Sequence, residues 1–223
     1  MGDLIRLSER RAARHGRATG AAPRPVRSGR PSRVELLFDL FCPFSYLAAE
    51  RVERAFDDVI WTPASTMALR AGSRPPAPDH VERLRSAAER RAAALRLPLV
   101  WPERFPAKVP TAMRAAAYAS ERGRGAAFVL AAFRLAFCGG FDLDDPEILA
   151  EAAAAAGIDI HGCLQAVGEV ARDEAIDAAG ARLLAAGADR LPALRVGRSL
   201  FWGENRVAAA AAAARQQAAA AAR

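Results

Sequence analysis

The alternation of apolar and polar positions near the start of the chain predicts a strand, a helix and a second strand. Residues 33–40, RVELLFDL, form a run of β-formers that is typical of a buried strand. Residues 44–57 then place apolar side chains at helical spacing, namely Phe44, Leu47, Ala48, Val52 and Phe56. A short strand is expected at residues 58–62, where Pro63 stops it.

The middle of the chain predicts a loop followed by a series of helices. Residues 64–79 contain one glycine and three prolines, so we expect them to be irregular. Helical patterns bounded by Gly, Pro or Asp then cover residues 80–97, 111–123, 125–137, 145–157, about 160–169 and 172–187.

Strand-forming residues return near the C-terminus. Residues 193–196 and 200–202 flank a Gly197-Arg198 turn, and residues 205–222 form an alanine-rich helical stretch. The order is β-α-β, a helical block, and then β-β-α. It predicts an α/β fold with one mixed sheet and an inserted, all-helical subdomain.

The positive charge of the chain is concentrated at its start. Residues 1–33 hold nine arginines and two acidic residues, which account for the whole formal net charge of +7. Such a segment buries too little apolar surface to fold alone, so residues 1–32 are predicted to be a disordered, Arg-rich arm. The arm can contact nucleic acid, anionic lipid or an acidic partner, or be a solvated tail. We expect no nucleic-acid contact beyond it.

Targeting signals limit the expected location of the protein, and cysteine spacing limits the roles of its cysteines. No charge-free apolar span suggests a membrane segment or a signal peptide, so a cytoplasmic protein is the default expectation. The alternative is an organelle-targeting segment, because the start of the chain is rich in arginine and poor in acidic residues. The three cysteines, Cys42, Cys138 and Cys163, have neither the spacing of a disulfide framework nor that of a metal site.

The junction between the first strand and helix points to thiol chemistry. Cys42 precedes Pro43 where a helix N-terminus directs free N–H groups at the sulfur, which predicts a lowered pKa and a reactive thiol. The alternative is a small buried apolar residue, which is our expectation for Cys138 and Cys163. Ser45 stands where a dithiol enzyme has its resolving cysteine. Its hydroxyl either supports the thiolate or satisfies the helix start, but cannot expel a mixed disulfide.

Four stretches of the chain together resemble one family. They are FDLFCPFSYLAAERVE at 38–53, IWTP at 60–63, FPAKVPTAMRAAAYA at 105–119 and LPALRVGRSLFWGENRV at 191–207. In this order they resemble the 2-hydroxychromene-2-carboxylate isomerases and kappa-class glutathione transferases, in the DsbA-like branch of the thioredoxin fold.

The resemblance implies a domain division. A thioredoxin-like domain is expected at residues 33–210, with its helical insertion at about 64–187 and an alanine-rich helix end at 211–223. Glutathione is the implied co-substrate, lying along the thioredoxin part. In the isomerases a serine at the start of the first helix holds the glutathione thiolate. That thiolate adds to a conjugated double bond, the bond rotates and the thiol leaves.

The resemblance also implies the site residues. Cys42 takes the place of that serine, and Pro192 is the expected cis-proline, with Leu191 offering its backbone to glutathione. Three positions depart from the family pattern: Cys42, Lys108 for an asparagine, and Glu204-Asn205 for a Ser/Gln-Asp pair. Glu204 could still pair with the glutathione ammonium group and Lys108 with a carboxylate. The predicted catalytic residues are Cys42 and Ser45, and the predicted binding residues are Phe44, Lys108, Leu191, Pro192, Glu204 and Asn205.

Three functions remain open on these grounds. The first is a glutathione-dependent isomerase or transferase that acts on a small aromatic or conjugated organic acid, without a metal. The second is a monothiol DsbA-like oxidoreductase that uses Cys42. The third is a non-catalytic binding protein on a thioredoxin scaffold, with the basic arm as its contact. The expected partners are small molecules; no membrane is expected, and a homodimer is left open.

Overall fold

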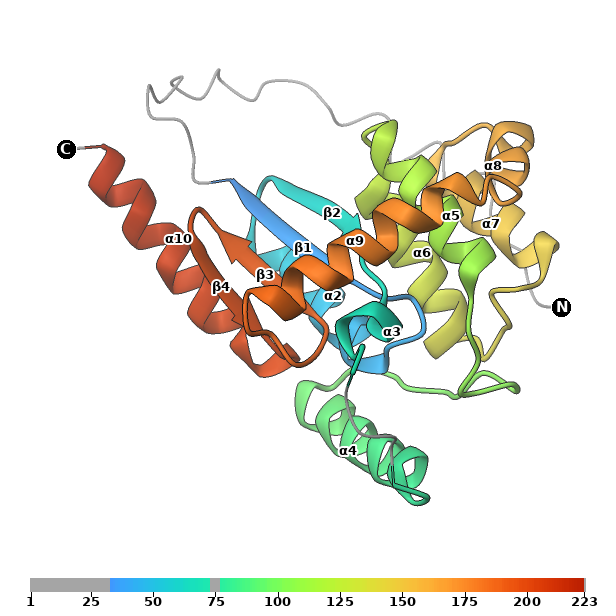
Figure 1. The fold of residues 1–223 in the computed structure, drawn as a ribbon, viewed down its shortest axis with the longest axis horizontal. Helices are drawn as coiled ribbons and strands as arrows, with labels where there is room; N and C mark the ends of the chain where they lie inside the picture. Colours follow the sequence, from blue (N-terminus) through green and yellow to red (C-terminus); the bar gives the residue numbers. More distant parts are fainter. Residues whose placement is uncertain (1–32, 73–76, 223) are drawn as a thin grey trace, which may run out of the picture.

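Four strands form one mixed sheet in the computed structural model, which describes residues 33–72 and 77–222 (Figure 1). The strands are β1 (Val34–Phe38), β2 (Val59–Pro63), β3 (Ala193–Val196) and β4 (Ser199–Trp202). Their order is β2-β1-β3-β4; β1 and β2 run parallel, whereas β3 is antiparallel to both β1 and β4. The predicted mixed sheet is confirmed. The predicted arm, residues 1–32, lies outside the described residues.

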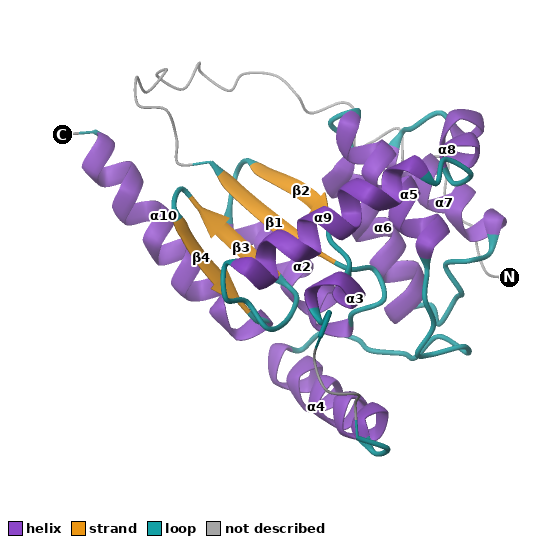
Figure 2. Cartoon of the chain, viewed as in Figure 1, coloured by secondary structure: helices purple, strands orange, loops and turns teal. Residues whose placement is uncertain are grey.

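Helices fill the connections in the order that the sequence predicted, with α3 as an addition (Figure 2). Helix α2 (Pro43–Ala55) joins β1 to β2, and the 3-10 helix η1 (Glu204–Arg206) and α10 (Val207–Ala221) follow β4. Between β2 and β3 lie α3 (Thr66–Leu69), α4 (His80–Leu95), α5 (Pro110–Glu121), α6 (Gly125–Phe137), α7 (Pro146–Ala156), α8 (Ile160–Ala166) and α9 (Ala171–Ala185). The predicted fold class is confirmed: a thioredoxin-like α/β sheet with inserted helices.

The two faces of the sheet pack against different helices because successive strand residues point to opposite sides. Leu36 and Phe38 of β1 join the larger core, which includes α2, α5 and α6. Leu37, between them, joins a smaller core with Leu69 of α3 and Leu183 of α9. Figure 1 looks onto the α9 side, with α2 behind the sheet.

One prediction about the loop at residues 64–79 is wrong, because α3 forms a helical turn within it. The Ser65 hydroxyl accepts a hydrogen bond from the Ala68 N–H at 3.1 Å, which satisfies a free amide at the start of the turn. Close packing on α9 holds the turn in place. A Cβ atom on Gly180 of α9 would lie 2.4 Å from the Ser65 carbonyl oxygen, so only glycine permits this approach.

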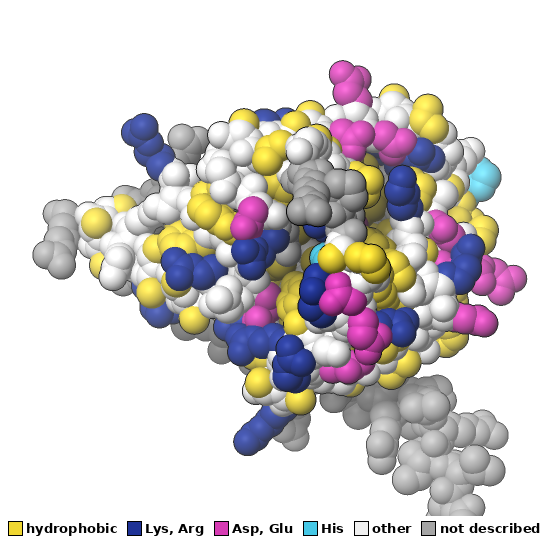
Figure 3. Space-filling view, turned by 60° about the horizontal axis from the view of Figure 1, so that its bottom comes forward, with side chains coloured by type: hydrophobic (Ala, Val, Ile, Leu, Met, Phe, Trp, Pro, Cys, Tyr) yellow, Lys and Arg dark blue, Asp and Glu magenta, His cyan; other side chains and the backbone are white. Residues whose placement is uncertain are grey.

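Helix α4 projects from the lower edge of the molecule in Figure 1. Arg85 lies over the Trp101 ring at 5.1 Å, and Trp101 Nε1 donates to Glu89 at 2.7 Å. Arg91 reaches the carboxylate of Glu204. Figure 3 turns this edge forward and shows basic and acidic side chains interspersed over it. None of the helices in the described part of the chain is long and apolar enough to cross a membrane.

Candidate active site

Cys42 occupies the turn between β1 and α2 and faces the segment that precedes β3. It is the N-cap residue of α2, and Pro43 begins the helix, where a missing N–H removes no helical hydrogen bond. The Cys42 thiol donates to the Leu191 carbonyl oxygen at 3.7 Å. The Leu191–Pro192 peptide bond is cis, as predicted. The fold therefore brings three of the predicted site residues together.

The protonation state of Cys42 differs from the expectation. Burial raises the pKa of the thiol from its ordinary 9.0 to about 11, and the charge of Asp39 adds to the rise. Hydrogen bonds from the Ser45 side chain and from the Ser45 and Phe44 backbone act in the opposite direction. The helix amides thus favour the thiolate as expected, but desolvation outweighs them. The predicted lowering of the pKa is wrong, and Cys42 is a neutral thiol at physiological pH.

Ser45 lies beneath this thiol. Its side chain is buried, hydrogen-bonds to Cys42, and accepts the Asp39 N–H at 3.4 Å. Phe44 is partly buried and packs against the larger core. Cys42 as a residue is partly exposed, whereas Ser45 beneath it is fully buried.

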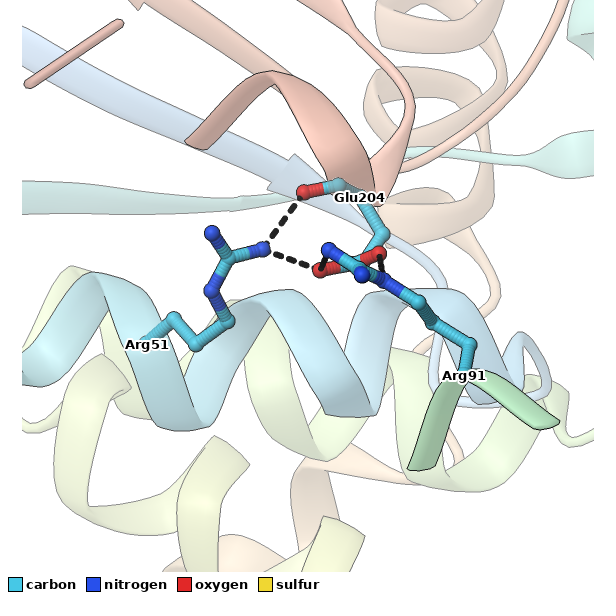
Figure 4. Close-up of polar contacts among 3 residues, drawn as sticks. All are labelled: Arg51, Arg91 and Glu204. Carbon is cyan, nitrogen blue, oxygen red and sulfur yellow. Dashed lines mark hydrogen bonds and ion pairs between the residues drawn. The ribbon is translucent and has the colours of Figure 1, made fainter. Parts of the chain in front are cut away.

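Glu204 is buried between two arginines, as Figure 4 shows. Arg51 of α2 pairs with Oε1 and also donates to the Glu204 carbonyl oxygen at 2.9 Å. Arg91 of α4 pairs with Oε2 and contacts Oε1 at 3.2 Å. Only 3% of the Glu204 side chain is exposed. Both oxygens are engaged, so this arrangement leaves no free oxygen for the expected contact with a glutathione ammonium group.

Asn205, the next residue, is exposed and lines a hollow of about 360 Å³. The other lining residues are Arg190, Leu200, Phe201, Trp202 and Arg206. The Gly203 N–H donates to the Pro192 carbonyl oxygen at 2.8 Å, which joins the rim of the hollow to the cis-proline segment. Arg190, which lines the hollow, directly precedes Leu191, the residue whose carbonyl oxygen faces the thiol.

Lys108 is exposed in the loop before α5. Within residues 33–72 and 77–222, it makes no hydrogen bond or ion pair. Its neighbours Ala107 and Val109 line a cavity of about 30 Å³ together with Phe41, which precedes Cys42. The structure therefore places the Lys108 segment beside the Cys42 turn, but shows no contact between the two side chains.

Sequence reasoning missed three side chains that shape this region: Asp39, Arg51 and Arg91. Asp39 could have been identified from the sequence, because it is an acidic residue inside an otherwise apolar run. Arg51 and Arg91 looked like ordinary charged positions on helix surfaces, and their shared partner is over a hundred residues away. The described residues contain no group of three or more His, Cys, Asp or Glu side chains that could hold a metal ion.

The family model of the DSBA-like thioredoxin domain matches residues 33–215. A solved structure of 2-hydroxychromene-2-carboxylate isomerase superposes with a TM-score of 0.70 at 21% identity, covering 83% of this chain and 97% of that chain. An oxidoreductase from Streptomyces coelicolor, assigned to the DsbA type, gives 0.64 at 21% identity, covering 83% and 89%. No curated protein matches the sequence. At these identities the structural likeness shows the fold alone.

Proposed function

Because this chain belongs to the DsbA-like thioredoxin domain family, we propose that it is a glutathione-dependent isomerase or transferase. It acts on a small aromatic or conjugated organic acid, in the manner of 2-hydroxychromene-2-carboxylate isomerase. One observation carries the proposal: Cys42 presents a neutral S–H group to the cis-proline segment. The resembled isomerases use a serine hydroxyl at this place, and a neutral thiol can likewise donate a hydrogen bond, though a weaker one.

The residues around Cys42 fit glutathione in part. The Leu191 N–H has no acceptor among the described residues, so it is free to bind the peptide backbone of glutathione. Asn205 offers hydrogen-bond groups at the edge of the hollow for its γ-glutamyl end, which leaves Arg206 for the substrate. Glu204 does not fit this role because Arg51 and Arg91 occupy its carboxylate.

The chemistry divides between ligand and protein. Bound glutathione supplies a thiolate that adds reversibly to a conjugated double bond of the substrate. To support that sulfur, the Cys42 S–H would turn from the Leu191 carbonyl oxygen, which it meets in the free protein, and donate its one hydrogen bond to the glutathione thiolate. Ser45 holds Cys42 from below and, being a hydroxyl, cannot form a competing disulfide.

The hollow suits an acidic aromatic substrate. Its volume of about 360 Å³ lies at the lower end of typical ligand pockets. Phe201 and Trp202 provide an apolar wall, and Arg206 provides a cation for a carboxylate. Arg190 is already paired with Asp189, so Arg206 is the stronger candidate for the substrate carboxylate.

The test compares two substitutions of Cys42. Glutathione binding is measured by calorimetry, and turnover of a hydroxychromene carboxylate by absorbance. If Cys42 acts as a hydrogen-bond donor, Cys42→Ser keeps turnover and Cys42→Ala loses it by about 10-fold or more. Cys163→Ala, a buried cysteine in α8, is the matched control and keeps turnover. Absence of glutathione binding in the unmodified protein would overturn the proposal.

A second candidate function is a monothiol oxidoreductase. Cys42 favours it because this partly exposed residue stands at a helix N-terminus in a fold shared with DsbA-type proteins. The Cys42 thiolate would attack glutathione disulfide, form a mixed disulfide and release one glutathione thiolate. This reading predicts a single adduct at Cys42 by mass spectrometry and loss of activity in both Cys42→Ser and Cys42→Ala.

A further inference from the structure

Asp39 stands at the end of β1, three residues before Cys42, and is buried with 8% of its surface exposed. All of its polar groups are engaged. Its carbonyl oxygen accepts the Cys42 N–H at 3.0 Å, and its own N–H donates to Ser45 Oγ at 3.4 Å. Oδ1 accepts the Phe41 N–H and Oδ2 accepts the Thr66 N–H, each at 3.0 Å.

These contacts fix the turn that carries the thiol. The bonds to Phe41 and Cys42 close the turn on itself and so set the direction of the Cys42 side chain. The bond to Thr66 ties the same turn to the start of α3, and through it to the packing on α9. The bond to Ser45 positions the hydroxyl beneath the sulfur. The Asp39 backbone therefore contacts both predicted catalytic residues, and its side chain holds that backbone in place through Phe41 and Thr66.

We propose that Asp39 is the positioning residue of the Cys42 site, holding the turn in which the sulfur meets Leu191 and the Ser45 hydroxyl. The inference rests on Cys42 being the functional thiol of the proposed function. A carboxylate is needed at this place because two N–H groups require two accepting oxygens. An asparagine would turn an NH₂ group toward one of these donors and leave it unsatisfied.

Besides holding the turn, Asp39 affects the pKa of the Cys42 thiol through its charge. Burial raises the pKa of Asp39, while the hydrogen bonds from Thr66 and Phe41 hold it down. The Asp39 charge in turn raises the pKa of Cys42. Other charged residues lie on the segments around the Cys42 turn and must be compared with Asp39, namely Arg70, Lys108, Asp189 and Arg190. Of the described charges, Asp39 alone contributes to the pKa of the thiol.

The experiment measures iodoacetamide alkylation of each cysteine by peptide mass spectrometry over a range of pH. At about pH 8, Asp39→Asn is expected to react roughly three- to tenfold faster at Cys42, because one of the Phe41 and Thr66 amides loses its acceptor, the turn opens around the sulfur, and one negative charge is lost. Cys163, buried in α8, is the internal reference and stays unreactive. Glu50→Gln is the matched control: it removes another buried carboxylate, paired with Arg134, and leaves Cys42 unchanged.

Two outcomes would overturn the inference. One is an unchanged Cys42 rate in Asp39→Asn. The other is an equal acceleration at Cys163, which would mean that the whole fold has loosened. Should Asp39→Asn fail to fold, hydrogen exchange of the unmodified protein decides: the Phe41 and Thr66 amides must be protected. Alkylation needs no glutathione. A failure of glutathione binding would therefore contradict the proposed function without affecting the result for Asp39.

Discussion

The Cys42 thiol donates to the carbonyl oxygen of Leu191 at 3.7 Å, although 149 positions separate the two residues in the chain. The contact exists because β1 and β3 are antiparallel neighbours, which brings the end of β1 beside the start of β3. The contact also favours the neutral thiol, because a thiolate could not donate this bond and would instead face a carbonyl oxygen of like partial charge.

The raised pKa of Cys42 makes a prediction about stability at alkaline pH. The folded protein keeps the thiol proton up to about pH 11, whereas the unfolded chain loses it near 9.0. The proton therefore stabilises the fold fully below about pH 9, and this contribution is lost as the pH rises toward 11. Over that window the native protein should lose on the order of 2 kcal/mol more than Cys42→Ser. Urea denaturation at several pH values measures the difference; parallel curves would contradict the raised pKa.

Much of the framework was predictable from local sequence. Pro43 after Cys42 marked the start of α2, and Gly157 marked the end of α7. The cis bond before Pro192 was predictable from the resemblance of its segment. These features depend on residues close in the chain, where the restrictions on proline and the freedom of glycine act directly.

The electrostatics of the site could not be predicted in this way. The sequence shows the amides at the start of α2, but not the burial that reverses their effect on Cys42. It shows Glu204 in the place of a ligand-binding residue, but not that Arg51 and Arg91 converge on it from two other helices. Desolvation and pairing of this kind arise only once distant segments have packed.

The ion pairs of Glu204 with Arg51 and Arg91 should contribute to the free energy of unfolding. Glu204→Gln leaves Arg51 and Arg91 without their common anion, but both keep a route to water, with 23% and 35% of their side chains exposed. The expected loss is therefore about 1–3 kcal/mol, below the cost of stranding a fully buried charge. Asp189→Asn is the control, since its pair with Arg190 is exposed and should change stability by less than about 0.5 kcal/mol. Equal effects in chemical denaturation would argue against a special role for Glu204.

The contact between α3 and α9 predicts that Gly180 cannot be replaced. Alanine favours helices, yet its Cβ would lie 2.4 Å from the Ser65 carbonyl oxygen and 3.1 Å from Ala68 Cβ. Backbone must move to relieve this, so Gly180→Ala should destabilise the protein by about 2 kcal/mol. Gly168→Ala provides the comparison, because its nearest neighbour would be at 3.4 Å, an ordinary contact. Thermal denaturation distinguishes them; a stabilised Gly180→Ala protein would mean that α3 packs less closely on α9.

The hollow beside the cis-proline segment predicts a specific role for Arg206 in binding an organic acid. Arg206 makes no ion pair within the described residues, so its charge is available to a substrate carboxylate. Arg206→Ala should raise the Kd for an aromatic acid roughly 3- to 30-fold, since charge-assisted hydrogen bonds at partly exposed sites contribute modestly.

Arg215→Ala removes an exposed arginine from α10, away from the residues that line the hollow, and should leave the Kd unchanged. Calorimetric titration at two salt concentrations measures both variants. The native protein and Arg215→Ala should lose affinity in high salt, and Arg206→Ala should lose less, because the screened ion pair is already absent. If both substitutions weakened binding equally, general positive charge and not this hollow would be what attracts the acid.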